Sequence, residues 1–157
     1  MLARSRHPLF RPLLVGWAIA STVLCLAYAR SIAHWWFPDP DDAMRLLQVR
    51  DWIGGQSWWD VDQHRLWGGA FRMHWSRLVD LPLAGVIVLA TPLLGSDAAA
   101  TLAMVLVPLA TLLAIMGAAA LLTERLAGEE AAGLALMLVP LSIPVIYQAS
   151  PDRKSVV

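Results

Sequence analysis

The sequence contains little charge and a single cysteine. Only 15% of its 157 residues are Asp, Glu, Lys or Arg, whereas about 25% is usual for a soluble domain. Because charged side chains are needed to cover a soluble surface, this composition argues against an ordinary soluble protein. Cys25 alone allows neither a disulfide framework nor a cysteine-based metal site. The formal net charge is zero, which gives no electrostatic reason to expect nucleic acid as a partner.

Apolar residues make up 58% of the chain and are concentrated in long runs. Residues 12–30, 97–123 and 131–148 have no charged side chain in their interiors. Runs of this length approach or exceed the roughly 20 residues that a helix needs to cross a membrane. The sequence therefore predicts transmembrane helices over these three ranges, the last of them kinked at Pro140 and Pro144.

Residues 81–95 form a further and shorter apolar run. Pro82 and Pro92 lie near its ends, and its length is nearer to that of a juxtamembrane or re-entrant helix than to that of a complete crossing. It remains a possible transmembrane helix, so the apolar pattern leaves three and four crossings open. Residues 124–130 are predicted to be a short connector between the two later spans.

The basic N-terminus predicts the orientation of the chain. Arg4, Arg6 and Arg11 precede the first apolar run, so the positive-inside rule places residues 1–11 in the cytoplasm. The protein is then expected in the inner (plasma) membrane, with residues 31–80 as an extracytoplasmic loop.

A cleaved signal peptide is an alternative interpretation of the first run. A basic start, an apolar centre and an Ala-Tyr-Ala site at residues 27–29 are all present. The run is long for a signal peptide, however, and further apolar runs follow it. A transmembrane helix is therefore favoured over cleavage.

The loop of residues 31–80 holds most of the acidic and aromatic side chains. Seven of the nine Asp and seven of the eight Trp lie between Trp35 and Asp80. Asp41 is predicted to be the N-cap of a helix that reaches Ile53 and stops at the glycines that follow. Its apolar stripe consists of Leu46, Leu47, Val49 and Ile53, with Arg45, Gln48 and Asp51 elsewhere.

This pattern predicts an amphipathic helix that can lie along the membrane surface. Tryptophans near the two ends of the helix are typical of interfacial anchors. These residues are Trp35, Trp36, Trp58 and Trp59.

Three carboxylates crowd the start of this helix, those of Asp39, Asp41 and Asp42. Acidic residues are stabilised at helix N-termini by the helix dipole and the free N–H groups, so capping is one interpretation. Three carboxylates in four residues also repel one another and need a compensating cation. A hard divalent ion such as Mg²⁺ or Mn²⁺ is the natural partner of such oxygen ligands. The residues alone leave both interpretations open.

A second polar cluster, with His74 and Arg77, precedes the run of residues 81–95. A cation pair at this position can hold a phosphate at the depth of the lipid headgroups. The alternative is an interfacial Arg77 that pairs with Asp80 and with a lipid phosphate. No H-E-x-x-H, P-loop, G-x-S-x-G or G-x-G-x-x-G pattern is present in the sequence.

The order of these features resembles the GT-C membrane glycosyltransferases, and among them the catalytic subunit of oligosaccharyltransferase and its bacterial relatives. Asp41 or Asp42, followed by a helix with Arg50-Asp51 near its end, resembles the acidic motif and helix of their first external loop. Residues 73–83 resemble the later part of that loop, where a short membrane-lying helix precedes the second span. The likeness extends over most of residues 10–150.

The resemblance implies an all-α, multi-pass transmembrane helical bundle with an amphipathic helix in the first extracytoplasmic loop. It implies a lipid-linked phospho-sugar donor and a glycan, lipid or protein acceptor at the extracytoplasmic membrane face. Asp41 and Asp42 would be the catalytic residues, with Asp39 as a further metal ligand. His74 and Arg77 would bind the substrate phosphate. The family layout also favours residues 81–95 as a juxtamembrane helix, and therefore three crossings.

GT-C enzymes have many more spans than this sequence provides. The tail Asp152–Val157 contains the only lysine and matches a translation of a widely used sequencing adaptor. We therefore expect residues 149–157 to be a truncated, non-native end, and the sequence to be an inactive N-terminal fragment. The alternative in a different class is a non-enzymatic membrane protein, such as a transporter fragment or an assembly partner, in which the Asp cluster only caps a helix.

Overall fold

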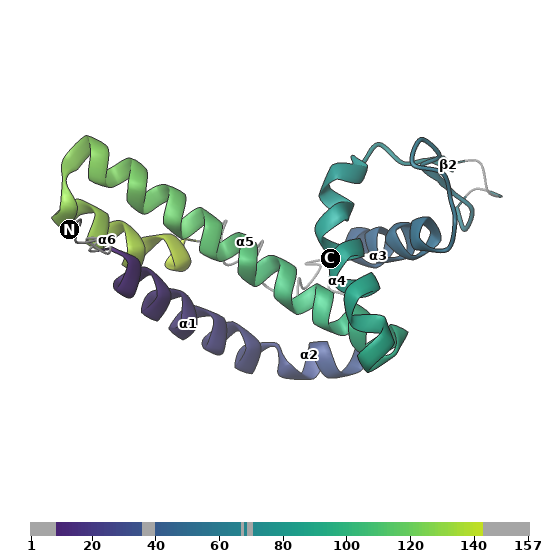
Figure 1. Cartoon of the computed structure of the whole chain (residues 1–157), viewed down its shortest axis with the longest axis horizontal. Coiled ribbons are helices and arrows are strands. Elements are labelled where there is room, and N and C mark those ends of the chain that lie inside the picture. The colour runs from purple at the N-terminus through teal and green to yellow at the C-terminus, as the bar shows by residue number, and fades with distance from the viewer. Residues whose placement is uncertain (1–8, 36–39, 67, 69–70, 143–157) are drawn as a thin grey trace, which may run out of the picture. The chain divides into compact units, whose positions relative to one another are not determined.

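The computed structural model describes residues 9–35, 40–66, 68 and 71–142. In this part of the chain the protein is mostly helical, with one short hairpin (Figure 1). Its elements are α1 (Phe10–Ala27), α2 (Ala29–His34), α3 (Pro40–Ile53), β1 (Asp62–Gln63), β2 (Phe71–Arg72), α4 (Arg77–Leu94), α5 (Ser96–Ala127), α6 (Glu129–Leu138) and the 3₁₀-helix η2 (Val139–Leu141).

Among the described residues, three helices are long and apolar enough to cross a membrane, namely α1, α4 and α5. The predicted spans at residues 12–30 and 97–123 correspond to α1 and α5. α5 also includes residues 124–127 of the predicted connector. Only Gly128, at φ +89°, separates α5 from α6. Glycine tolerates this left-handed backbone, which is the usual way to end a helix.

The predicted span at residues 131–148 corresponds only in part to a described helix. α6 ends at Leu138, and the backbone then tightens into η2 around Pro140. Proline has no N–H to continue the α-helical pattern, which explains the change at the predicted kink. Pro144 and the rest of that predicted span lie outside the described residues, as do Asp39 and the whole tail of residues 149–157.

The run at residues 81–95 belongs to a helix longer than the apolar pattern indicates. α4 has 18 residues and begins at Arg77, with Ser76 as its N-cap. The Ser76 hydroxyl accepts a hydrogen bond from the Leu78 N–H at 3.2 Å, which satisfies one of the free donors of the first turn. The helix includes the charged Arg77 and Asp80, which are both buried. Length therefore no longer argues against a crossing by α4.

The chain divides into two compact units, each with its own apolar core. The first contains α1, α2, α6, η2 and the part of α5 from Pro108 onward. Its core includes Leu9, Leu112, Met116 and Ala132. In Figure 1, α1 and α6 lie along this part of α5.

Close contacts show that α1 and α5 run antiparallel within the first unit. A Cβ on Gly117 would lie 3.6 Å from Leu13 Cδ2. Four residues further along α1, the Trp17 indole Nε1 donates to the Leu109 carbonyl at 2.7 Å. As residue numbers increase along α1, the residue numbers of the contacting positions on α5 decrease, so the two helices are antiparallel. Small residues at such a contact let two helices approach closely, as in membrane bundles.

The second unit contains α3, the hairpin, α4 and the beginning of α5. Leu46 and Val49 of α3 pack against Ala84 of α4 and Ala100 of α5. The small alanines allow α3 to pack closely over these two helices, and burial of its apolar side chains stabilises the contact. α3 is therefore the element that fixes the loop to the longer helices.

Three details of α3 differ from the prediction. The helix begins at Pro40, so Asp41 lies in its first turn and is not its N-cap; proline is favoured as a first helical residue. Gln48 is buried, as are Leu46 and Val49, whereas Ile53 is exposed. The apolar face is directed to α4 and α5, so it is not available to lie on a membrane surface.

Candidate functional site

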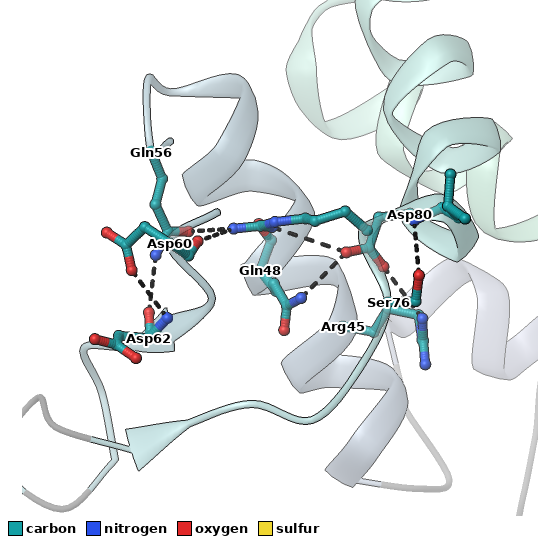
Figure 2. Close-up of polar contacts among 9 residues, drawn as sticks. Arg45, Gln48, Gln56, Asp60, Asp62, Ser76 and Asp80 are labelled. Carbon is teal, nitrogen blue, oxygen red and sulfur yellow. Dashed lines mark hydrogen bonds and ion pairs between the residues drawn. The ribbon is translucent and has the colours of Figure 1, made fainter. Parts of the chain in front are cut away.

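The candidate site is formed where α3 packs on the first turn of α4 (Figure 2). The i, i+3 spacing of Arg77 and Asp80 puts both on one face of α4, and Arg45 and Gln48 have the same spacing on α3. We call these four residues the Asp80 cluster. The apolar packing brings these residues together, and they interact through their side chains and the Gln48 backbone carbonyl.

The Asp80 carboxylate is at the centre of the cluster. Its Oδ1 accepts from Arg45 Nη1 at 3.1 Å, and its Oδ2 accepts from Gln48 Nε2 at 3.1 Å. Figure 2 shows both side chains reaching Asp80 from α3. Arg77 Nη1 lies 3.8 Å from the same Oδ2. A buried carboxylate needs such partners, because desolvation of an unpaired charge is costly.

Arg77 connects α4 to α3 and to the segment that follows α3. Nη1 donates to the Gln48 carbonyl at 3.0 Å. Nη2 donates to Gln56 Oε1 at 2.8 Å and to the Asp60 carbonyl at 2.6 Å. The side chain is 3% exposed. The structure thus places the predicted phosphate-binding Arg77 inside the protein, with both Nη atoms bonded to the chain itself.

The segment after α3 is folded onto it by further polar contacts. Gln56 Nε2 donates to the Asp62 carbonyl at 2.9 Å, and the Asp62 N–H donates to Asp60 Oδ1 at 3.0 Å. β1 and β2 pair antiparallel, with Asp62 opposite Arg72. This segment therefore has a defined conformation rather than being an open polar loop.

Arg45 differs from Arg77 in its exposure. Its side chain is 25% exposed, and its guanidinium lies over the Trp75 ring, 4.8 Å from the centroid. The ring of His74, the other predicted phosphate ligand, is exposed and lies 5.8 Å from that of Trp75. Arg45 and His74 thus each contact Trp75, whereas the sequence interpretation grouped His74 with Arg77.

Asp41 and Asp42 are exposed in the first turn of α3. Neighbouring helical residues do not face each other, and no group of three or more His, Cys, Asp or Glu suited to a metal is found among the residues that the structure describes. The third predicted ligand, Asp39, lies outside those residues. Mg²⁺ is nevertheless commonly held by one or two carboxylates together with substrate phosphate and water, and Asp41 and Asp42 fit this sparse kind of site.

The Arg50-Asp51 pair near the end of α3 is engaged in two different contacts. Arg50 Nη2 donates to Asp97 Oδ1 at 2.9 Å, at the start of α5, and its guanidinium lies over the Trp35 ring at 5.0 Å. Asp51 accepts two hydrogen bonds from Arg65, at 2.6 and 3.1 Å. These bonds and the charge of Asp51 raise the pKa of Arg65 above its ordinary value. Both residues hold α3 to neighbouring segments.

The sequence interpretation offered the pairing of Arg77 with Asp80 as an alternative, and the structure contains this ion pair, but the interpretation missed Arg45 and Gln48 as partners from α3. Two features of the sequence could have indicated the cluster. The i, i+3 spacing puts Arg45 with Gln48, and Arg77 with Asp80, on one helix face each, and the second pair is a charge pair at the edge of an apolar run. Spacing does not say which helix packs on which, so the cluster could not be assembled without the tertiary contact. In comparisons with protein-family models, with curated proteins and with solved structures, no match to this chain was found.

Proposed function

We propose that this chain provides the first extracytoplasmic loop and adjoining helices of a GT-C-type membrane glycosyltransferase. The enzyme would transfer sugar from a polyprenyl-phosphate-linked donor to a glycan, lipid or protein acceptor. One observation carries the proposal: Asp41 and Asp42 are exposed at the start of a helix whose remaining length is fixed by buried packing and ion pairs. Catalytic groups need this combination of access and rigid support.

Asp41 and Asp42 have two roles in the proposed reaction. One carboxylate accepts the proton of the acceptor hydroxyl, or orients an acceptor amide, as sugar is transferred. The other holds the divalent cation, with Asp39 as a further ligand. When bound, Mg²⁺ or Mn²⁺ supplies positive charge that stabilises the departing phosphate. The Asp80 cluster keeps α3 in place, so that both carboxylates retain their positions during the reaction.

The topology of the proposed bundle follows from the antiparallel arrangement of α1 and α5. If both cross the membrane, the end of α1 and the start of the crossing part of α5 lie on one side. The part of α5 in the first unit, residues 108–127, is about 30 Å long, which is enough for a crossing. Residues 28–107 must then make an even number of crossings.

This parity argues against a crossing by α4. Within the described part of residues 28–107, α4 is the only helix long and apolar enough to form a span by itself, and one crossing would be an odd number. Its outward residues are apolar, as the exposed Leu78, Leu89 and Leu93 illustrate, so lipid must cover them. α4 is therefore proposed to lie in the membrane interface, with residues 1–11 in the cytoplasm and the loop outside the inner membrane.

A second candidate function is that of a non-enzymatic assembly partner. It is favoured by the intramolecular use of the charged pairs: Arg50 with Asp97, and Asp51 with Arg65. Such a loop is stable without any ligand. In this case the two first-turn carboxylates have no catalytic role and help to stabilise the start of the helix.

The two functions can be distinguished by replacing Asp41 and Asp42 in the full-length protein, assayed in its own membrane. The double variant Asp41→Asn/Asp42→Asn is expected to lower sugar transfer from a radiolabelled polyprenyl-phosphate donor by about 100-fold or more, the usual effect of losing a general base. Asp62→Asn, which changes an exposed carboxylate of the same loop, is the matched control and should leave transfer unchanged. Wild-type transfer by the double variant, at equal insertion, would overturn the proposed roles of Asp41 and Asp42, and absence of transfer by the unaltered protein would favour the assembly partner.

A further inference from the structure

The burial of Arg77 changes which cation can receive a phosphate at this site. Both Nη atoms of Arg77 already donate to chain oxygens. Its Nε has no partner among the described residues, but it is buried as well. A phosphate could reach Arg77 only by displacing Gln56 and the Asp60 carbonyl, and the folded segment would be lost with them.

Arg45 has the properties that Arg77 lacks. One of its terminal nitrogens, Nη1, is bonded to Asp80, and its guanidinium is placed over Trp75. Nη2 and Nε donate to no residue within the described ranges, and part of the side chain is exposed. Two neighbouring N–H donors in one plane match the oxygens of a phosphate. Because Asp80 and Trp75 already fix the side chain, little rotamer entropy remains to be lost on binding.

The charge of the Asp80 cluster also favours an anion. Two guanidinium groups, of Arg45 and Arg77, lie within 4 Å of a single carboxylate, at 3.1 and 3.8 Å. The four residues of the cluster by themselves therefore carry an excess of one positive charge, which Asp41 and Asp42, one turn earlier on α3, would oppose unless the proposed cation neutralises them. Because Asp80 is buried and Arg45 is mostly buried, solvent screens this charge less than it would on an open surface.

The position of Arg45 on α3 connects it with the first-turn carboxylates. Asp41 and Asp42 precede it by four and three residues, which is about one helical turn, or about 5 Å along the axis. A cation held by the carboxylates and a phosphate held by Arg45 would therefore be neighbours. Asp80 also belongs to the beginning of α4, the helix proposed to lie in the interface, so Arg45 is expected at the depth of lipid headgroups.

We infer that Arg45, held over Trp75 by its bond to Asp80, binds the phosphate group of a lipid. This inference rests on the proposed function in so far as the lipid is the polyprenyl-phosphate donor. The same chemistry is offered by the headgroup of an ordinary anionic phospholipid. The two sources differ in their lipid part and can be separated experimentally.

The test is the modification of arginines by phenylglyoxal in the whole chain reconstituted in phosphatidylcholine nanodiscs, followed by peptide mass spectrometry. One arm adds polyprenyl phosphate, a second adds phosphatidylglycerol, and a third adds inorganic phosphate. Lipid phosphate is expected to slow the modification of Arg45 by about tenfold, the effect of a contact of about 1.4 kcal/mol. Arg72, an exposed arginine of the same loop, is the internal control and should react at an unchanged rate.

A pair of variants provides an independent measurement. Arg45→Gln should weaken binding of polyprenyl phosphate to the nanodiscs by about tenfold or more, whereas Arg72→Gln removes the same charge and should not. Equal modification of Arg45 with and without every lipid overturns the inference, and so does equal binding by the two variants. Protection by phosphatidylglycerol alone supports Arg45 as a lipid-phosphate ligand but identifies the bulk membrane as its source. Because no sugar transfer is measured, failure of this inference is distinguishable from failure of the proposed function.

Discussion

The side-chain amide of Gln48 donates to Asp80 Oδ2 at 3.1 Å, across 32 positions of the sequence. Both residues are buried, and Gln48 lies next to Val49, which has no exposed surface. The hydrogen bond therefore sits within the apolar contact between α3 and α4. Apolar contacts alone tolerate sliding, whereas a buried polar pair has one satisfactory geometry, so this bond sets the register of the two helices.

Removal of the Asp80 carboxylate should strongly destabilise the second unit. Asp80→Ala leaves Arg77 buried with no neighbouring anion, a change that costs about 3–5 kcal/mol for a buried pair. The measurement is the free energy of unfolding in detergent micelles by denaturant titration. Asp62→Ala removes a carboxylate that is exposed and is the control. Overlapping unfolding curves for the two variants would show that Asp80 is not a structural anion.

The exposed pair of Asp51 and Arg65 should contribute much less. Arg65→Gln is expected to lower the free energy of unfolding by about 1 kcal/mol or less, because solvent screens an exposed ion pair. The same titration in high salt should reduce the difference from wild type further. A loss comparable to that of Asp80→Ala would contradict this ranking of the two pairs.

The same pair should give no pH dependence near neutrality. The pKa of Arg65 is raised in the folded protein, so its contribution is complete below the ordinary arginine pKa and is lost only as the pH rises through the raised value. The difference in unfolding free energy between wild type and Arg65→Gln should therefore be constant from about pH 6 to about pH 9. A steady change across that interval would require another titrating partner.

Two glycines near the turn between α5 and α6 should respond oppositely to alanine. Gly128 has φ +89° and ψ 177°, a conformation that costs a residue with a Cβ about 1–3 kcal/mol. Gly133 lies inside α6, and a Cβ there would meet nothing within 4 Å. Gly133→Ala is thus expected to stabilise by about 0.5–1 kcal/mol through helix propensity. Thermal unfolding of the two variants checks the signs, and a stabilising Gly128→Ala would contradict the turn geometry.

The interfacial position of α4 can be tested with cysteines on either side of it. In a Cys25→Ser background, Ser57→Cys and Ser96→Cys are both at exposed positions, one before and one after α4. Both should react with a membrane-impermeant maleimide added outside intact cells. Ala127→Cys, at the other end of α5, should react only after permeabilisation. Labelling of only one of the two flanking cysteines would show that α4 crosses the membrane.

The sequence predicts the long helices well, because a membrane span and an amphipathic segment leave strong local patterns. The start of α5 near Asp97 and the end of α3 at Ile53 both agree with the apolar pattern and the glycines. The beginning of α4 was misjudged, since Arg77 and Asp80 look like the end of a polar loop. In the structure they are the first turn of the helix, because each finds buried partners on α3.

The candidate site was predictable only at its exposed edge. The start of α3 within the acidic run agrees with the sequence, although Asp41 lies in the first turn and is not the predicted N-cap; the roles of Asp41 and Asp42 remain predictions. The sequence could not indicate that Arg45, and not Arg77, is the more accessible candidate for binding phosphate, because both are arginines close to apolar residues. What separates them is burial on a neighbouring helix, which is a property of the tertiary fold.

The core beneath α3 has a practical consequence for anyone who wishes to study this loop in water. Leu46 and Val49 pack on Ala84, Ala100 and Ala103, and these three alanines lie outside residues 31–80. As an isolated peptide, the loop would lose this packing surface, and α3 alone is too short to remain helical in water. A soluble version of the loop must therefore include α4 and the first turns of α5, with the exposed leucines of these helices replaced by polar residues.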